Sequence, residues 1–321
     1  MTRRCMNDGC FAADGEACAL GHMDLAQCPS WMQAAPPEAE PAAAPVRTIG
    51  GRVPWSGSAL GLADLANLTP RARTILVGVL GAHDAGKTTL LTGNYLRLIR
   101  GETLAGARFA GSRTLGAWES LAAWTRFDDA ARLPSFPPHT PRGTARVPGL
   151  LHLALRSSAD ELRDVLLTDA PGEWFSRWST KENAPDAEGA RWIARNADAF
   201  LVLADCERLC QPGRGSSRND IRKLLERLGN HVRSRPTVLV WAKADFRPSD
   251  GIREAIRDAL GSRIPHAKEV EATTNRVESL ADALETALAP AWSGPTARPI
   301  TVPILQHEPF TVFRGSPHAH A

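Results

Sequence analysis

The chain has 321 residues, of which 43% are apolar and 23% charged, values typical of a globular protein with one full α/β domain and an appendage. Its formal net charge of +3, without a long run of Lys or Arg, argues against a nucleic-acid partner. No apolar stretch approaches the roughly 20 residues of a membrane span, and no signal-peptide core follows the N-terminal arginines. We therefore expect a cytoplasmic protein without a membrane partner.

Four of the six cysteines lie in the first 28 residues, within a segment that we interpret as a small Cys-rich module over residues 1–32. In a reducing compartment such clustering indicates a metal site rather than disulfides. The module offers one ligand more than tetrahedral zinc needs, and the five candidates are Cys5, Cys10, Cys18, His22 and Cys28. A Cys₄ site and a Cys₃His site both fit this pattern. Free thiols in a disordered tail are the alternative.

The rest of the chain is divided by composition. Residues 33–70 are rich in Pro, Ala and Gly and predict a linker, residues 71–292 a folded domain, and residues 293–321 a flexible tail. Strands are expected near residues 74–80, 150–155, 165–168, 199–204, 236–241 and 270–272, and helices near 88–99, 279–288 and part of 112–127. No strand is expected between residues 101 and 146. Strands that are apolar throughout and alternate with helices predict an α/β P-loop fold, with a mostly parallel sheet and helices on both faces.

A phosphate-binding loop is predicted at Gly81–Thr88, which matches G-x-x-x-x-G-K-[ST] at every fixed position between a predicted strand and a predicted helix. Gly86 lets the main chain approach the phosphates, and the N–H groups at the helix start form an anion nest. Lys87 is expected to reach the β- and γ-phosphates and Thr88 to bind Mg²⁺. The predicted nucleotide contacts here are Gly81, His83, Asp84, Ala85, Gly86, Lys87, Thr88 and Thr89. A chance glycine turn is the alternative.

A second acidic site is predicted where an apolar strand ends in Asp169, followed by Gly172 in a D-x-x-G pattern. Asp169 is expected at Mg²⁺ and the Gly172 N–H at the γ-phosphate, whereas a polar strand end with a turn glycine is the alternative. Glu173 stands where Ras-related GTPases often have a glutamine that orients water. Its charge is unfavourable beside a γ-phosphate, so we predict slow intrinsic hydrolysis. The predicted catalytic residues are Lys87 and Glu173.

A threonine that senses Mg²⁺ is expected before the second strand of the domain. Thr140, ten residues ahead of that strand, is our prediction, and Thr114 is the rival. Either residue could instead belong to a turn or cap a helix.

Base recognition is predicted at Lys243 and Asp245, which follow a strand where GTPases carry N-K-x-D. Asp245 can accept hydrogen bonds from guanine N1–H and N2–H₂, and the Lys243 stem can pack on the ring. Adenine presents an acceptor there, which faces a carboxylate unfavourably. Ala242 replaces the usual asparagine and removes a hydrogen bond worth about 0.5–1.5 kcal/mol. Chance occurrence of Lys and Asp at a strand end is the alternative.

The stretches GAHDAGKTTLL, FAGSRTL, FPPHT, LLTDAPGEWF and WAKAD together resemble the TRAFAC-class GTPases of bacterial double-GTPase conflict systems, in particular the second GTPase of the pair. The resemblance covers about residues 71–292, and the Cys-rich start resembles a zinc-finger-like module that some members carry. It implies GTP and GDP as ligands, Mg²⁺ as cofactor, a partner GTPase with activating or effector proteins, and a role in defence.

Three functions follow from these patterns. The first is a regulatory GTPase that cycles between GTP- and GDP-bound forms. The second is an adenine-specific P-loop ATPase, for which Ala242 is the main support. The third is a non-hydrolysing scaffold that nucleotide stabilises and whose zinc module docks a partner.

Overall fold

The computed structural model describes residues 4–5, 10, 12, 15–32, 59–68, 73–126, 135–136 and 148–293. The chain divides into two compact units, residues 1–52 and residues 53–321. Residues 294–321, for which we expected a flexible tail, lie outside the described residues.

The N-terminal unit contains a small two-stranded sheet. Strand β1 (Arg4–Cys5) pairs antiparallel with β2 (Trp31–Met32). A short 3-10 helix, η2 (Leu25–Gln27), precedes β2, and the Asp24 carboxylate accepts a hydrogen bond from the Ala26 N–H at its start. This segment is too short to bury a hydrophobic core of its own, so its fold depends on such local contacts.

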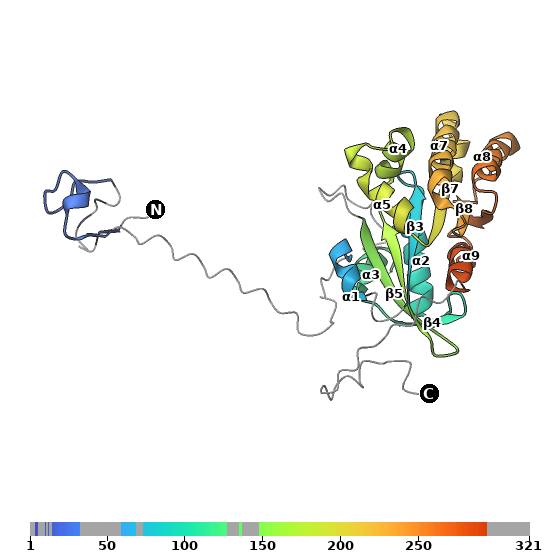
Figure 1. Ribbon diagram of the computed structural model, residues 1–321, viewed down its shortest axis with the longest axis horizontal. Helices are drawn as coiled ribbons and strands as arrows, with labels where there is room; N and C mark the ends of the chain where they lie inside the picture. Colours follow the sequence, from blue (N-terminus) through green and yellow to red (C-terminus); the bar gives the residue numbers. More distant parts are fainter. Residues whose placement is uncertain are drawn as a thin grey trace. The chain divides into compact units, whose positions relative to one another are not determined.

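The second unit is organised around a seven-stranded sheet with the strand order β4-β5-β6-β3-β7-β8-β9 (Figure 1). The strands are β3 (Arg73–Gly81), β4 (Ala107–Gly111), β5 (Gly149–Ser157), β6 (Leu162–Asp169), β7 (Ala199–Asp205), β8 (Thr237–Ala242) and β9 (Lys268–Ala272). Five neighbouring strands, β6, β3, β7, β8 and β9, run parallel, whereas β4–β5 and β5–β6 pair antiparallel. The predicted α/β sheet, mostly parallel, is therefore confirmed.

Helices cover both faces of this sheet (Figure 1). Their bounds are α1 (Leu65–Leu68), α2 (Lys87–Ile99), α3 (Leu115–Ala122), α4 (Gly172–Thr180), α5 (Glu188–Asn196), α6 (Cys206–Cys210), α7 (Arg214–Val232), α8 (Asp250–Arg263) and α9 (Glu278–Ser293). Alternate strand residues point to opposite faces, so Leu76 belongs to the apolar cluster that includes residues of α4, α5, α7 and α8, while its neighbour Val77 belongs to the cluster that includes residues of α2, α3 and α9. Burial on both faces explains why these strands are apolar throughout.

Two boundaries differ from the sequence expectation. Strand β4 lies between residues 101 and 146, where we expected none; it is a short edge strand whose side chains are alternately buried and exposed. The linker predicted over residues 33–70 does not extend over residues 59–68. Leu60 and Leu68 are fully buried in the core, and Leu60 exchanges two main-chain hydrogen bonds with Leu150 of β5.

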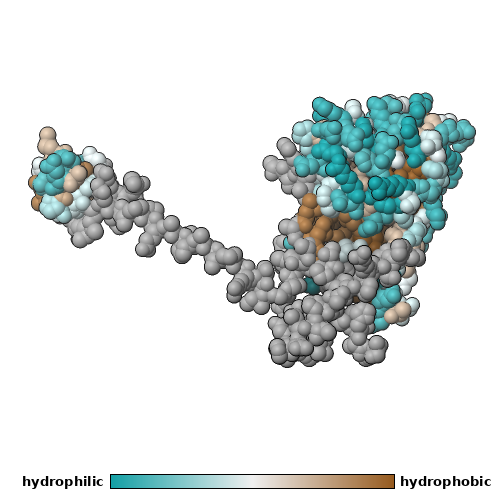
Figure 2. Space-filling view, viewed as in Figure 1, coloured by the Kyte–Doolittle hydropathy of each residue, from teal (hydrophilic) through white to brown (hydrophobic). Residues whose placement is uncertain are grey.

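The topology brings several loops together at one end of the sheet, where the parallel strands finish. Strands β3, β6, β7, β8 and β9 are parallel, so their carboxyl ends meet there. Figure 2 shows a hydrophilic surface at the end of the domain where α4, α7 and α8 lie. The loops that follow the parallel strands carry the residues described next.

Candidate nucleotide-binding site

A pocket of about 450 Å³ opens at the carboxyl edge of the parallel strands. Residues from the loops after β3, β6, β7, β8 and β9 line it. The lining includes His83, Asp84, Ala85, Gly86, Lys87, Thr88, Thr89, Gly172, Glu173, Lys243 and Asp245, which the sequence predicts as nucleotide or catalytic residues. Clefts at this position of an α/β sheet are where such folds bind ligands.

The loop after β3 is closed around its own lysine. Helix α2 begins at Lys87, and Asp84 and Gly86 adopt the left-handed conformation at φ 65° and 87°. The Lys87 ammonium group donates hydrogen bonds to the main-chain oxygens of Gly81 at 3.1 Å and of Ala82 at 2.8 Å. The cation predicted to bind phosphates is thus held inside the loop.

Burial of Lys87 changes its protonation. The loss of solvation lowers the pKa of Lys87 to about 8, although Asp169, Glu173 and Asp84 oppose the shift by their charge. An anionic ligand in the pocket would add negative charge near this ammonium group and favour its protonated form.

Two of the three predicted Mg²⁺ ligands, which come from separate loops, are in contact. The Thr88 hydroxyl donates a hydrogen bond to Asp169 Oδ1 over 3.1 Å. Thr88 lies in the first turn of α2, and Asp169 is the last residue of β6. A hydroxyl and a carboxylate oxygen at this separation are hard oxygen donors of the kind that Mg²⁺ prefers, so the residues present fit the ion.

Gly172 joins the second loop to the first. A Cβ atom added at Gly172 would lie 2.2 Å from the His83 main-chain nitrogen and 2.4 Å from the Ala82 carbonyl carbon. No side chain fits at that distance, so glycine is required for the two loops to touch. The contact places the residue after Gly172, Glu173, beside the phosphate-binding loop.

The Glu173 carboxylate faces a histidine of that loop. Glu173 Oε1 lies 3.7 Å from His83 Nδ1, and Asp84 Oδ2 lies 3.9 Å from His83 Nε2. Of the aromatic residues that follow Glu173, Phe175 and Trp178 are buried in the core. Helix α4, which begins at Gly172, is therefore anchored by its apolar side.

Only one of the two candidates for the Mg²⁺-sensing threonine, Thr114, lies among the described residues. Thr114 is fully buried, and its hydroxyl accepts a hydrogen bond from the His152 N–H at 2.9 Å. It also lies 3.3 Å from the Ser112 hydroxyl and is not among the residues that line the pocket. In this structure Thr114 therefore has a structural role at the start of α3. Thr140 lies outside the described residues and stays a prediction.

The end of the pocket where we predict base recognition, called the base end below, is formed by the loops after β8 and β9. Thr273 donates a hydrogen bond from its hydroxyl to Asp245 Oδ1 at 2.8 Å, which leaves the rest of the carboxylate for a ligand. Ala242 lines the pocket but offers no side-chain hydrogen bond. The exposed Phe246 ring, which the sequence analysis did not identify, lies at the same end.

Lys243 is held by two acidic residues that the motifs did not reveal. It adopts a left-handed conformation with φ 56°, and its ammonium group donates to Asp205 Oδ2 at 2.9 Å and Glu207 Oε2 at 2.8 Å. Burial lowers the pKa of Lys243, but these hydrogen bonds outweigh burial and the pKa rises above its ordinary value. Both acids come from the end of β7 and from α6, which follows it.

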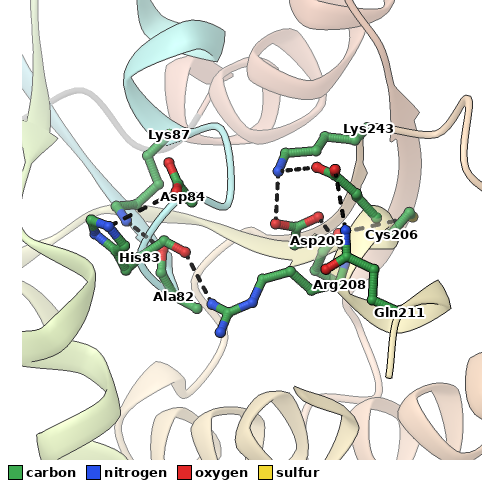
Figure 3. A network of polar contacts seen from close by, with 11 residues as sticks. Ala82, His83, Asp84, Lys87, Asp205, Cys206, Arg208, Gln211 and Lys243 are labelled. Atoms are coloured by element: carbon green, nitrogen blue, oxygen red, sulfur yellow. Dashed lines mark hydrogen bonds and ion pairs between the residues drawn. The ribbon is translucent and has the colours of Figure 1, made fainter. Parts of the chain in front are cut away.

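Helix α6 also reaches the phosphate-binding loop (Figure 3). Its Arg208 donates from Nη1 to the main-chain oxygen of His83 at 3.2 Å, and the Arg208 main-chain N–H donates to Asp205 Oδ1 at the start of the helix. Asp205 is the acceptor for Lys243 as well. One continuous set of polar contacts thus connects the base end of the pocket to the phosphate end.

The predicted zinc ligands Cys5, Cys10, Cys18, His22 and Cys28 belong to the N-terminal unit. Cys18 Sγ lies 3.9 Å from Cys28 Sγ. A hydrogen bond from the Ala19 main chain is the largest effect that lowers the pKa of Cys10, and hydrogen bonds with the Cys5 and Cys18 thiols add to it. Among the described residues, however, no group of three or more His, Cys, Asp or Glu side chains is arranged to hold a metal ion.

No helix in the described part of the chain has both the length and the apolar character needed to cross a membrane.

The fold and this site define a P-loop protein of the GTPase type. The sequence matches the family model Double-GTPase 2 over residues 75–292, which is about two thirds of the chain. The chain therefore belongs to the double-GTPase family, and GTP binding is the activity that this membership and the fold suggest.

Similarity to individual proteins is weak. The translation elongation factor SelB from Methanococcus maripaludis, solved in complex with the GTP analogue GppNHp, is 14% identical, with a TM-score of 0.37. The match covers 70% of this chain and only 35% of that one. No curated protein matches the sequence.

Proposed function

We propose that the chain is a nucleotide-dependent switch that binds GTP with Mg²⁺ and hydrolyses it slowly. The observation that carries this proposal is the contact between Thr88 and Asp169 at 3.1 Å, because Thr88 lines a pocket whose other end holds Lys243 and Asp245. One set of residues suits a Mg²⁺-bound triphosphate and the other suits guanine. Their placement in one pocket supports a single nucleotide that spans both.

Each group has a task in this proposal. The Lys87 ammonium group binds the β- and γ-phosphates, and the Gly172 N–H meets the γ-phosphate. Thr88 and Asp169 would hold Mg²⁺, which neutralises phosphate charge when it is bound. Asp245 accepts hydrogen bonds from guanine. Because loss of the γ-phosphate removes a partner of Gly172, the start of α4 can report the nucleotide state.

Slow hydrolysis follows from Glu173. A carboxylate can accept a hydrogen bond from water, but it also repels a γ-phosphate. We therefore expect the isolated protein to hydrolyse GTP far more slowly than an ordinary enzyme turns over. Single-turnover hydrolysis at a rate near 1 s⁻¹ or above, the lower end of typical enzyme rates, would contradict this expectation.

The decisive experiment compares nucleotide affinities. Equilibrium binding of GTP, GDP and ATP should be measured with Mg²⁺ and with a chelator, using the full chain. We expect GTP to bind more tightly than ATP, and Mg²⁺ to strengthen GTP binding. Tighter binding of ATP would instead support the ATPase alternative, which Ala242 favours. Tight GTP binding without phosphate release over hours, with or without partner proteins, would support the scaffold alternative.

The N-terminal module and the cellular role stay predictions. The zinc site stays a prediction from the cysteine pattern, since no group of three or more ligands among the described residues is arranged to hold a metal ion. Metal analysis of the purified protein tests it, and accessible Cys5 and Cys28 thiols in a zinc-free folded protein would refute it. A partner GTPase, effector proteins and a role in bacterial defence are implied by the resemblance. Co-purification with the partner GTPase, the first of the pair, tests that implication.

A further inference from the structure

The His83 imidazole lies between two carboxylates. Its Nδ1 is 3.7 Å from Glu173 Oε1, and its Nε2 is 3.9 Å from Asp84 Oδ2. Both separations are those of ion pairs that a protonated imidazole forms with carboxylates.

Two cations hydrogen-bond the main chain at and next to His83. Arg208 donates to the His83 carbonyl oxygen, and the Lys87 ammonium group binds the oxygen of the preceding residue, Ala82 (Figure 3). These two cations hold the loop, whereas the imidazole faces the two acids. His83 is 46% and Glu173 31% exposed in their side chains, so both can be reached by a ligand in the pocket.

The contact between the two loops places this pair at the γ-phosphate. The Cβ position of Gly172 is 2.2 Å from the His83 nitrogen, and the Gly172 N–H is the group proposed to meet the γ-phosphate. Glu173 follows Gly172 directly. The histidine and the glutamate therefore meet at the end of the pocket where the triphosphate terminates, on opposite sides of the loop contact.

We propose that His83 is a positioning residue for GTP hydrolysis, which holds the Glu173 carboxylate beside the γ-phosphate and offsets its charge. The inference rests on the proposed function, because it concerns the water that attacks the bound GTP. Without a cation next to it, Glu173 would be repelled from the phosphate and would turn away. With His83 beside it, the carboxylate can stay and accept a hydrogen bond from that water.

The chemical step is balanced without a further reactant. The water oxygen forms a bond to the γ-phosphorus while the bond from that phosphorus to the β,γ-bridging oxygen breaks. The electron pair of the broken bond stays on the bridging oxygen, which becomes a terminal oxygen of GDP. Glu173 orients the water through one of its protons, and this proton passes to an oxygen of the released phosphate. His83 exchanges no proton with the substrate and acts only through Glu173.

A double-mutant cycle in single-turnover GTP hydrolysis tests the proposal. The variants are His83→Ala, Glu173→Gln and the double variant, each measured with excess full-length protein and Mg²⁺. We expect His83→Ala to lower the hydrolysis rate about tenfold when Glu173 is present, and less than about twofold in the Glu173→Gln background. The dissociation constant of GTP should change less than about threefold. An equal loss in both backgrounds, or no loss in either, overturns the proposal.

A charge-retaining variant supplies an independent readout. His83→Lys keeps a cation beside Glu173, so we expect it to hydrolyse GTP faster than His83→Ala. If Glu173→Gln hydrolyses GTP too slowly for the double-mutant cycle, the comparison of His83→Lys with His83→Ala tests the proposal by itself. Equal rates for these two variants overturn it. His231→Ala is the matched control, because His231 Nε2 lies 3.2 Å from Glu182 Oε1, and neither residue lines the pocket. It should leave the rate unchanged within about twofold.

The outcome separates this inference from the proposed function. If the unaltered chain does not bind GTP, the proposed function fails. If it binds and hydrolyses GTP, and His83→Ala does so at the same rate, only the role of His83 fails.

Discussion

The two ends of the pocket are built by different means. At the phosphate end the main chain provides most of the site, from the loop Gly81–Thr88 and from Gly172, which packs against it without space for a side chain. At the base end side chains provide the site: Lys243 and Asp245 face the pocket, and Asp205 with Glu207 hold the lysine. The phosphate end keeps the full motif, whereas the base end has lost the asparagine usual at Ala242.

The difference shows how much change each kind of site accepts. A main-chain site depends on glycine at positions where any Cβ atom collides, so its sequence pattern stays recognisable. A side-chain site can be supported by other residues. The two acids that bind Lys243 position it by ion pairs, and this support does not need a side-chain amide at Ala242. Three substitutions and one measurement of pH dependence test this contrast, from the largest expected effect on nucleotide binding to the smallest.

The largest effect should come from the phosphate end. Lys87→Ala removes the cation expected to bind the β- and γ-phosphates, and hydrogen bonds to charged groups contribute about 1.5–3 kcal/mol each. We expect the dissociation constants of GTP and GDP to rise about 100-fold or more in equilibrium binding. Lys268→Ala, which removes an exposed lysine on β9, is the control and should bind normally. Unchanged GTP affinity in Lys87→Ala would remove the basis of the proposed function.

At the base end, Asp245→Asn should change selectivity. The amide cannot accept both guanine hydrogen bonds, whereas adenine gains a possible donor in place of a repelling carboxylate. We expect the dissociation constant of GTP to rise roughly 30-fold, consistent with the loss of one or two charged hydrogen bonds. That of ATP should stay the same or fall. Thr273→Val, which removes only the hydroxyl that donates to Asp245, is the milder comparison. A parallel loss of both nucleotides would show that Asp245 does not read the base.

The pH dependence of GTP binding tests the buried lysine. The pKa of Lys87 is lowered to about 8 by burial, and bound phosphates should raise it, so binding takes up a proton once the pH exceeds 8. Affinity should therefore be constant below pH 7 and fall as pH rises through 8, by roughly tenfold at pH 9.

The control for this pH dependence is Lys87→Arg, because a guanidinium group stays protonated over the whole range. Guanine itself loses a proton at high pH, so the two proteins are compared at each pH. Equal pH profiles would mean that Lys87 does not titrate in this range.

Much of the fold follows from the sequence, and the exceptions have physical reasons. The buried parallel strands were predicted because burial on both faces demands uninterrupted apolar runs, such as Ala199–Asp205. Strand β4 was missed because an edge strand needs only one buried side, and its residues carry a weak pattern. Leu60 and Leu68 were assigned to the linker because the surrounding Pro, Gly and Ala residues hide two isolated core positions.

The site also combines residues that the sequence predicts with residues that it does not predict. Motif residues were predictable because the phosphate chemistry requires them in a short stretch of sequence. The partners of these residues were not predictable, because they come from distant segments with ordinary composition. Asp205 and Glu207 precede Lys243 by a whole helix and strand, and His83 precedes Glu173 by nearly half of the domain. Only the packing of the sheet brings such pairs together.

The smallest predicted effect concerns the link between the two ends of the pocket. Arg208→Ala removes an exposed hydrogen bond to the His83 carbonyl oxygen, worth about 0.5 kcal/mol at its surface position. We expect GTP to bind about two- to threefold more weakly, as measured by equilibrium titration beside the unaltered chain. Arg214→Ala, which removes an exposed arginine on α7, is the matched control. If α6 transmits order from Lys243 to the phosphate loop, Lys243→Ala and Arg208→Ala together should lose less affinity than the sum of the single changes. Strict additivity would mean that the two ends of the pocket are supported independently.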